Sequence, residues 1–265
     1  MIKTILSPRT KSLVHGTCIA MLTLAFSACQ SAQHHQPAAT LADSEAAIAA
    51  PRSIEFEWMS LATWRAKHAE DVAIAAKGDV DLLFLGDSIT EGWGWGDNQK
   101  IFDANFGQYK WANFGIGGDQ TQHLLWRLQN GSTGKLAPKV IVLMIGVNNF
   151  GHSNHSAEDV YSGIAANVDY IRNAFPKAKL VLHAVLPYDQ NATSPNRDRV
   201  TATNALVATL ADNKHVFVYD FGEIFLDPKG DIPQALMSDF LHPSHDGFQL
   251  FADKLAPVVQ TFMEE

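Results

Sequence analysis

Short apolar runs alternate with helix-length stretches along most of this chain. The runs are continuous and rich in β-branched or aromatic residues, as in strands buried on both faces of a parallel sheet. They cover residues 80–85, 111–114, 140–145, 180–186 and 216–219, and stretches with helical apolar spacing cover 53–77, 121–129, 157–175, 196–211 and 248–262. The alternation predicts an α/β domain with a central, mostly parallel five-stranded sheet and right-handed crossovers.

The first 28 residues have the pattern of an export signal. Three basic residues lie within 1–11, and a mostly apolar stretch without acidic residues follows over 12–28. That stretch contains His15 and is slightly shorter than the roughly 20 apolar residues of a membrane helix, so a permanent transmembrane anchor is the less favoured interpretation.

The predicted signal ends in Phe26-Ser27-Ala28-Cys29, which resembles a bacterial lipoprotein box. In such a box the Cys is lipidated after cleavage, which here predicts lipidation at Cys29 and a membrane-anchored protein of the bacterial cell envelope or periplasm. Ordinary cleavage after Ala28, which would give a secreted protein, is the alternative.

Residues 29–51 are rich in Ala, Gln and small polar residues and contain no aromatic side chain, which predicts a flexible tether. Residues 52–265 then form one domain, long enough for a sizeable core. Because Cys18 lies in the predicted signal, Cys29 would be the one cysteine left, which excludes an intramolecular disulfide and a cysteine metal site.

The charge and the motifs exclude several classes of partner. The formal charge is −8 and becomes −11 without the three basic residues of the predicted signal, whereas nucleic-acid binding needs a basic face. The glycines of 115–118 lack the full dinucleotide-loop spacing, and no Walker loop is present. The His-x-x-His pairs at 152–155 and 242–245 have no evident third ligand. We therefore expect no cofactor and no metal.

Ser88 follows the first apolar run, at a strand end. In open α/β sheets the ligand crevice lies at the carboxyl ends of the strands, where segments 86–88, 115–119, 146–149 and 187–188 would meet. A serine in this place fits two roles, because serine is a favoured helix N-cap and also a nucleophile when a base activates it.

A second segment supplies candidates for that base and for its partner. Asp239 and His242 lie three residues apart in 238–247, so that the carboxylate could hold the imidazole while its other nitrogen faces a serine. The spacing alone is a weak signal, since Asp-x-x-His pairs often occur by chance. Ser88 does not lie in a G-x-S-x-G elbow, which argues against the α/β-hydrolase fold.

Four blocks carry a family resemblance: "GDS" (86–88), "NFGIGGDQTQHLLWRLQNG" (113–131), "IGVNN" (145–149) and "SDFLHPSHDG" (238–247). In order and separation they resemble the SGNH, or GDSL-type, hydrolases, particularly the branch of the platelet-activating factor acetylhydrolase catalytic subunits. The resemblance implies a three-layer α/β/α, flavodoxin-like fold. Asn149 stands where the wider family more often has Asp, although that branch also has Asn.

The resemblance also implies roles for single residues. Ser88 would attack the acyl carbon, His242 would take its proton, and Asp239 would orient His242. The backbone amides of Ser88 and Gly118 and the side-chain amide of Asn148 would form the oxyanion hole.

Five further residues are expected to contact substrate from their positions near the crevice: Asp87, Trp93, Trp95, Phe150 and Tyr188. The expected function is an exported serine esterase that cleaves short, mainly acetyl, esters through an acyl-enzyme. Its substrate would be an acylated small molecule, glycan or lipid, with a carbohydrate O-acetylesterase as the first expectation. A lysophospholipase or thioesterase, or a non-catalytic glycan-binding lipoprotein, are the alternatives.

Overall fold

Five parallel strands form one sheet in the computed structural model, which describes residues 44–265. The strands are β1 (Leu82–Gly86), β2 (Trp111–Gly115), β3 (Val140–Met144), β4 (Lys179–His183) and β5 (Val216–Tyr219). Their order is β2-β1-β3-β4-β5, and every neighbouring pair is parallel. This is the flavodoxin-like order, so the predicted fold class is confirmed.

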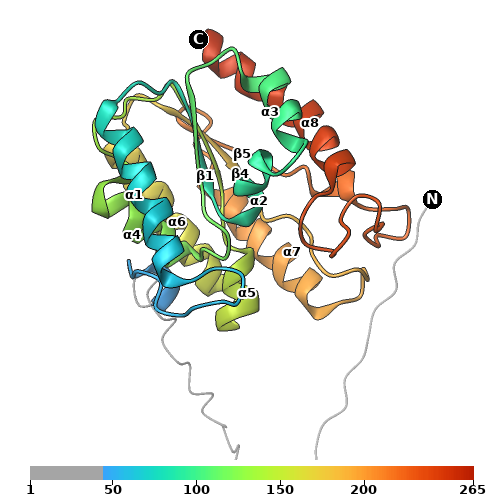
Figure 1. Ribbon diagram of the computed structural model, residues 1–265. Coiled ribbons are helices and arrows are strands. Elements are labelled where there is room, and N and C mark those ends of the chain that lie inside the picture. Colours follow the sequence, from blue (N-terminus) through green and yellow to red (C-terminus); the bar gives the residue numbers. More distant parts are fainter. Residues whose placement is uncertain (1–43) are drawn as a thin grey trace, which may run out of the picture. The chain divides into compact units, whose positions relative to one another are not determined.

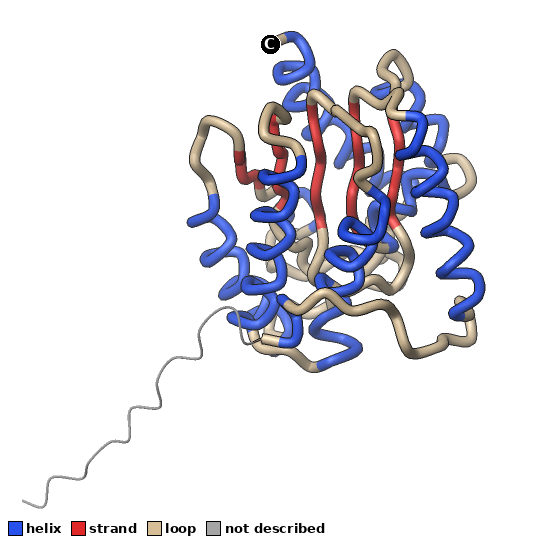
Figure 2. The backbone as a smooth tube through the Cα atoms, turned by 90° about the vertical axis from the view of Figure 1, so that its left-hand side faces the viewer, coloured by secondary structure: helices blue, strands red, loops and turns tan. Residues whose placement is uncertain are grey.

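Helices cover both faces of the sheet. They are α1 (Leu61–Lys77), α2 (Ser88–Glu91), α3 (Asn98–Phe106), α4 (Thr121–Arg127), α5 (Val147–Ser153), α6 (Ala157–Ala174), α7 (Pro195–Val207) and α8 (His245–Glu264). Shorter helical turns are η2 (Glu45–Ala47), η3 (Gly92–Gly94), η4 (Leu128–Ser132), η5 (Ala208–Leu210) and η6 (Gly222–Phe225). Helices α1, α4 and α6 lie on one side of the sheet and α3 and α8 on the other (Figures 1 and 2).

The strand order explains this division. The step from β1 to β2 runs in the opposite direction to the three later steps, so a right-handed crossover places α3 on the face opposite α4 and α6. Helix α7 packs against α6, and α8 packs against α3. The loops after the strands consequently meet at one edge of the sheet.

The predicted helix of residues 53–77 is shorter in the structure because it begins at Leu61. Ser60 caps it, with its side-chain oxygen accepting a hydrogen bond from the Thr63 amide at 3.0 Å, and Gly78 ends it in a left-handed conformation. The preceding residues form a turn closed by an antiparallel bridge between Phe56 and Met59. This turn lies near the candidate site described below.

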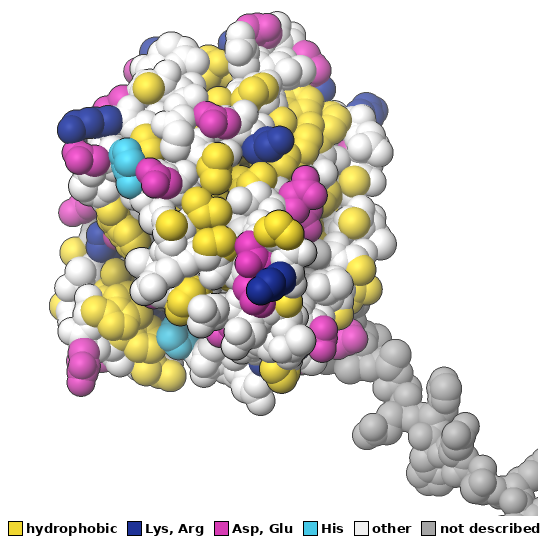
Figure 3. All heavy atoms as spheres, turned by 90° about the vertical axis from the view of Figure 1, so that its right-hand side faces the viewer, with side chains coloured by type: hydrophobic (Ala, Val, Ile, Leu, Met, Phe, Trp, Pro, Cys, Tyr) yellow, Lys and Arg dark blue, Asp and Glu magenta, His cyan; other side chains and the backbone are white. Residues whose placement is uncertain are grey.

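The core lies on both faces of the central strands. All five residues of β1 and of β3 are buried. On the α3 side an aromatic cluster fills the space between sheet and helices: Phe84, Trp93, Phe102, Phe106, Phe248 and Phe251. Burying one such side chain stabilises the fold by roughly 1.5–3 kcal/mol. The outer face on this side carries scattered acidic and basic side chains among apolar ones, rather than a continuous basic surface (Figure 3).

The predicted tether is wrong for residues 44–51. Ser44 donates to an Asp159 carboxylate oxygen at 2.8 Å, the Thr121 hydroxyl donates to the Ala46 carbonyl at 2.8 Å, and Ala46 is fully buried. The Ala50 amide adds a hydrogen bond to the Gln122 carbonyl. Small alanines suit this close packing against α4 and α6, whereas composition alone resembles that of a linker.

The other N-terminal predictions lie outside the described residues, namely the signal of 1–28, lipidation at Cys29 and the tether up to residue 43. Within residues 44–265, no helix has both the length and the apolar character that crossing a membrane requires.

Candidate active site

Ser88 is the first residue of α2 and lies at the carboxyl edge of the sheet, just after β1. The cap of that helix is Asp87, whose carboxylate accepts a hydrogen bond from the Ile89 amide at 3.0 Å. Burial raises the pKa of Asp87 to about 7. Of the two roles that fit Ser88, capping therefore belongs to its neighbour, and the Ser88 hydroxyl is free for another partner.

That partner is His242, whose Nε2 lies 2.8 Å from Ser88 Oγ. The other ring nitrogen, Nδ1, lies 2.6 Å from Asp239 Oδ2. Burial raises the pKa of Asp239, but hydrogen bonds from His242 outweigh this effect and leave the pKa below its ordinary value. The sequence-predicted serine, histidine and aspartate thus form one continuous hydrogen-bonded chain.

A tight turn holds the acid and the imidazole in this register. The second oxygen of Asp239 accepts hydrogen bonds from the backbone amides of Leu241, at 3.1 Å, and His242, at 2.8 Å. Phe240 between them has a left-handed backbone (φ 59°), and its carbonyl accepts from the Asp189 amide at 3.0 Å. A side chain that closes the turn of its own loop is a common role for Asp, and here it also sets the spacing to the imidazole.

The two other predicted oxyanion donors are Gly118, on the loop after β2, and Asn148, in the helix that follows β3. Gly118 has a φ of +75°, a conformation that favours glycine, and a Cβ at this position would meet the Trp58 ring at 2.6 Å, so the ring would have to shift. The Gly118 amide has no acceptor within residues 44–265. Asn148 in α5 donates one side-chain N–H to the Asp119 carbonyl at 3.0 Å, which leaves the second N–H for a ligand.

Asn149 has a supporting contact rather than a place at the cavity. Its carbonyl oxygen accepts from the Thr121 amide at 2.9 Å, and its amide nitrogen lies 2.9 Å from the Thr121 hydroxyl. It therefore joins the start of α4 to α5, which carries Asn148.

The serine, the histidine and the two donors face one cavity of about 600 Å³. Its lining comprises Trp58, Met59, Thr63, Lys67, Ser88, Glu91, Trp95, Gly117, Gly118, Asn148, His152, Leu241 and His242. Trp58 and Trp95 are 59 % and 43 % exposed, so both present indole surface to an incoming molecule. Such a cavity is much larger than an acetyl group needs.

Of the five residues expected to contact substrate, Trp95 is at the cavity, with its ring centroid 5.6 Å from that of His242. Asp87 is occupied as the helix cap. Phe150 and Tyr188 are buried and stack on each other at 6.1 Å, outside the cavity lining. Both residues follow strand ends, as expected, but their side chains point into the core and pack there instead of lining the cavity.

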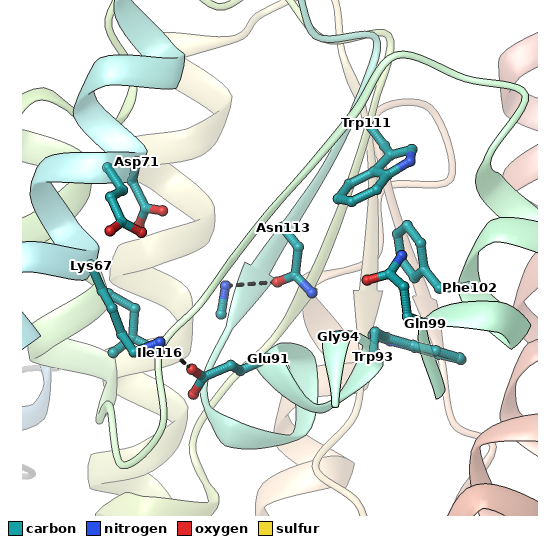
Figure 4. Close-up of a pocket in the computed structure, with 12 residues that line it drawn as sticks. Lys67, Asp71, Glu91, Trp93, Gly94, Gln99, Phe102, Trp111, Asn113 and Ile116 are labelled. Atoms are coloured by element: carbon teal, nitrogen blue, oxygen red, sulfur yellow. Dashed lines mark hydrogen bonds and ion pairs between the residues drawn. The ribbon is translucent and has the colours of Figure 1, made fainter. Parts of the chain in front are cut away.

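Trp93 is also absent from this lining and is 2 % exposed, with its ring 4.6 Å from Phe248. It borders a separate pocket of about 200 Å³ between α1 and α3 (Figure 4). An ion pair of Lys67 and Glu91, 2.7 Å apart, lies where this pocket and the larger cavity share their lining.

A buried charge cluster beneath the Gly117–Gly118 segment was not predicted from the sequence. Asp119 accepts from Arg52 at 2.9 Å, from Trp64 Nε1 at 2.7 Å and from Arg127 Nε at 2.7 Å. Arg127 also contacts Asp71, whose pKa is raised to about 7 because burial outweighs the pull of the arginine. One sequence feature could have indicated the cluster. Asp119 and Arg127 lie eight residues apart, on opposite sides of a short apolar stretch.

In the described part of the chain, no group of three His, Cys, Asp or Glu side chains is arranged to hold a metal ion. In the first His-x-x-His pair, His152 belongs to the cavity lining while His155 lies 3.1 Å from the Asn149 amide nitrogen. In the second, His242 contacts Ser88 and Asp239 while His245 contacts Asn98 at 3.3 Å. The histidines that sequence spacing paired thus have separate surroundings.

Comparison with known proteins places this geometry in a family. The model of the GDSL-like lipase/acylhydrolase family matches residues 84–250. The human platelet-activating factor acetylhydrolase IB subunit alpha1 is 35 % identical over 186 residues, which is 70 % of this chain and 78 % of that protein. The rat alpha2 subunit is 32 % identical over 202 residues, or 76 % of this chain and 86 % of the relative.

Solved structures agree in fold. A GDSL-like lipase from Bacteroides thetaiotaomicron has a TM-score of 0.60 at 20 % identity and covers 76 % of this chain and 98 % of its own. A variant of an acetyl-xylooligosaccharide esterase from Geobacillus has a TM-score of 0.53 at 20 % identity, with 67 % and 93 % covered. The chain described here belongs to the GDSL-like lipase/acylhydrolase family and is an ester-hydrolysing enzyme.

Proposed function

We propose that the protein is a serine esterase that removes short acyl groups, acetyl first, from saccharide esters by way of an acyl-enzyme. The observation that carries the proposal is the hydrogen-bonded chain from Ser88 through His242 to Asp239 at the wall of a cavity that also presents Gly118 and Asn148. A nucleophile, a base, an orienting acid and anion donors are the groups that acyl transfer requires.

In the first half-reaction Ser88 Oγ forms a bond to the acyl carbon while its proton passes to Nε2 of His242. The negative charge that develops on the carbonyl oxygen is met by the amides of Ser88 and Gly118 and by Asn148. The carbonyl then re-forms, the bond to the alcohol oxygen breaks, and His242 gives its proton to that oxygen. Asp239 stabilises the imidazolium between these two transfers.

In the second half-reaction a water molecule takes the place of the alcohol. His242 accepts a proton as the water oxygen attacks the acyl carbon, and returns it to Ser88 Oγ as the serine leaves. The products are the carboxylic acid and the free serine, so atoms and protons balance over the cycle.

The choice of acyl group and alcohol rests on the cavity and on the relatives. Two exposed tryptophans and a charged pair, Lys67 with Glu91, offer apolar faces beside polar groups, which suits a ring with hydroxyls on its edge. The relatives more than 30 % identical are named acetylhydrolases, which favours an acetyl group.

The test is activity of purified wild-type protein and Ser88→Ala towards p-nitrophenyl acetate and acetylated xylooligosaccharides, with Ser162→Ala as control. Ser162 lies in α6, where its hydroxyl bonds to the Glu158 carbonyl, so this control loses a hydroxyl away from the cavity. Wild type and Ser162→Ala should release acetate and Ser88→Ala should not. A fluorophosphonate probe should label Ser88 in the wild type.

A series of p-nitrophenyl esters separates the remaining possibilities. A sharp preference for acetyl supports the proposal, and a preference for long acyl chains favours a lysophospholipase or thioesterase instead. Folded protein that neither turns over esters nor takes the probe would favour a non-catalytic glycan-binding protein.

We also propose export and lipid anchoring, from the signal pattern of residues 1–28 and the box that ends at Cys29. In a bacterium expressing the full chain, metabolically supplied palmitate should label the wild type, and the protein should fractionate with membranes. Cys29→Ser should abolish the palmitate labelling. Equal labelling of the two proteins would contradict the anchor.

A further inference from the structure

Gly117 is held from both sides by charged groups. Its amide donates to a Glu91 carboxylate oxygen at 2.7 Å, and its carbonyl accepts from Arg52 Nη2 at 2.5 Å. Glu91 is in turn paired with Lys67. Both peptide groups that flank Gly117 are thereby fixed, although two successive glycines are the residues that most easily change conformation.

The carbonyl of Gly117 and the amide of Gly118 belong to the same peptide unit. In a planar trans peptide the C=O and the N–H point in opposite directions. Because Arg52 takes the carbonyl on the buried side, the Gly118 N–H points away from Arg52, and Gly118 itself lines the cavity. The contact to Arg52 therefore sets the direction of an oxyanion donor.

The buried position of the Arg52 guanidinium is energetically unfavourable. Arg52 is 2 % exposed, and its Nε has no acceptor among the described residues. Its remaining hydrogen bonds go to Asp119 and, at 3.3 Å, to the Met59 sulfur. Its guanidinium carbon also lies 5.4 Å and 5.9 Å from the ring centroids of Phe56 and Trp64. A buried guanidinium with an unused donor destabilises a fold, which is a pattern found at functional sites.

We infer that Arg52 is a positioning residue of the esterase, which holds the Gly117–Gly118 peptide so that the Gly118 amide faces the oxyanion. The inference rests on the proposed serine mechanism. Without Arg52 the Gly117 carbonyl loses its partner, and the peptide can rotate to find another, which turns the donor away from the cavity.

The change Arg52→Met leaves the rest of the cluster supported. Asp119 keeps its hydrogen bonds from Trp64 and Arg127, both at 2.7 Å, so the variant should fold. With p-nitrophenyl acetate we expect kcat to fall roughly 10- to 100-fold with KM within about twofold, since loss of a whole oxyanion donor costs about 10²–10³ in rate.

An aryl trifluoromethyl ketone separates positioning from general damage. It forms a hemiketal oxyanion with the serine and so depends on the same donors, and its Ki should rise by the factor by which kcat/KM falls. Arg52→Lys keeps the positive charge beside Asp119 and should show a smaller change in both quantities.

Arg172→Met is the matched control, because Arg172 also bonds to backbone carbonyls, of Phe175 and Ala178, but at the far end of α6. It should lower the Tm and leave kcat and Ki unchanged. A folded Arg52→Met with wild-type kcat and Ki would overturn the inference. Should Arg52→Met not fold, Arg52→Lys decides, and unchanged kcat/KM there overturns it.

The two proposals fail in different ways. If wild type itself releases no acetate and is not labelled at Ser88, the proposed function is wrong. If wild type and Ser88→Ala behave as proposed while the Arg52 variants match wild type, the positioning role alone is wrong.

Discussion

Ser88 Oγ and His242 Nε2 lie 2.8 Å apart, although 154 positions separate the two residues in the chain. Ser88 is the first residue of α2, just after β1, and His242 lies in the turn before α8. The packing of Phe248 in α8 against Trp93, 4.6 Å between ring centroids, joins the two segments. The aromatic core thus holds together the two segments that carry this contact.

Asp239→Asn should inactivate the enzyme by fixing the wrong imidazole tautomer. An amide turned with its N–H towards Nδ1 of His242 makes that nitrogen an acceptor, so Nε2 carries the proton and cannot accept one from Ser88. We expect kcat to fall by about 10²–10⁴. Asp227→Asn is the control, since Asp227 also closes a turn by accepting from backbone amides. Equal activity of both variants would contradict the role of Asp239.

Asn148→Ala should lower kcat towards p-nitrophenyl acetate by about 10²–10³ with little change in KM, because the oxyanion donor acts mainly in the transition state. Asn105→Ala removes a half-buried side-chain amide from α3, where it donates to the Ile101 carbonyl. That control should retain full activity. A rise in KM alone for Asn148→Ala would assign this residue to ground-state binding instead.

The two neighbouring tryptophans should respond in opposite ways. Trp95→Ala removes a wall of the cavity and should raise KM for acetylated oligosaccharides more than for p-nitrophenyl acetate, at nearly unchanged Tm. Trp93→Phe should destabilise the fold by about 1–3 kcal/mol, because it shrinks a buried side chain, and leave KM unchanged. Steady-state kinetics and urea unfolding measure both.

His183 should make the fold sensitive to acid. Its Nδ1 lies 2.6 Å from the Ala184 carbonyl, its Nε2 accepts from the Phe221 amide, and burial lowers its pKa to about 4. Since the unfolded chain binds the proton near pH 6.5, stability is complete above that pH and falls as the pH drops through 4. The loss is on the order of 3 kcal/mol.

His183→Gln keeps an acceptor for Phe221 and cannot titrate. Comparing the free energies of unfolding of wild type and this variant at pH 7 and pH 4.5 isolates the contribution of His183, because other titrating groups are common to both. A pH dependence that is the same in both proteins would contradict the assignment.

The strands could be predicted because each is a short apolar run whose burial needs no knowledge of its partners. Helices α3 and α5 are not predicted, since they are short and their apolar residues face neighbours that the sequence does not identify. The predicted flexible tether is wrong for residues 44–51 for a related reason. Their composition is that of a linker, and their order comes from hydrogen bonds to residues more than 70 positions away.

The candidate triad and donors could be named because they lie in the four sequence blocks that resemble the GDSL-type hydrolases. The surroundings of Trp93 and Trp95, two residues apart, could not be predicted in this way. The η3 turn directs one ring into the core and the other to the cavity, and no local pattern distinguishes them. Arg52 had no motif at all, since its partners become neighbours only in the folded chain.

The bond from Arg52 to Gly117 has a consequence for where such an enzyme can be cut and joined. The region matched by the family model, 84–250, contains Ser88, Gly118, Asn148, Asp239 and His242, but neither Arg52 nor α1. A chimera that takes residues 84–250 from a relative would combine the relative's glycine loop with the Arg52 guanidinium of this chain. The two groups did not evolve together. A breakpoint ahead of Arg52 would transfer the loop together with its support.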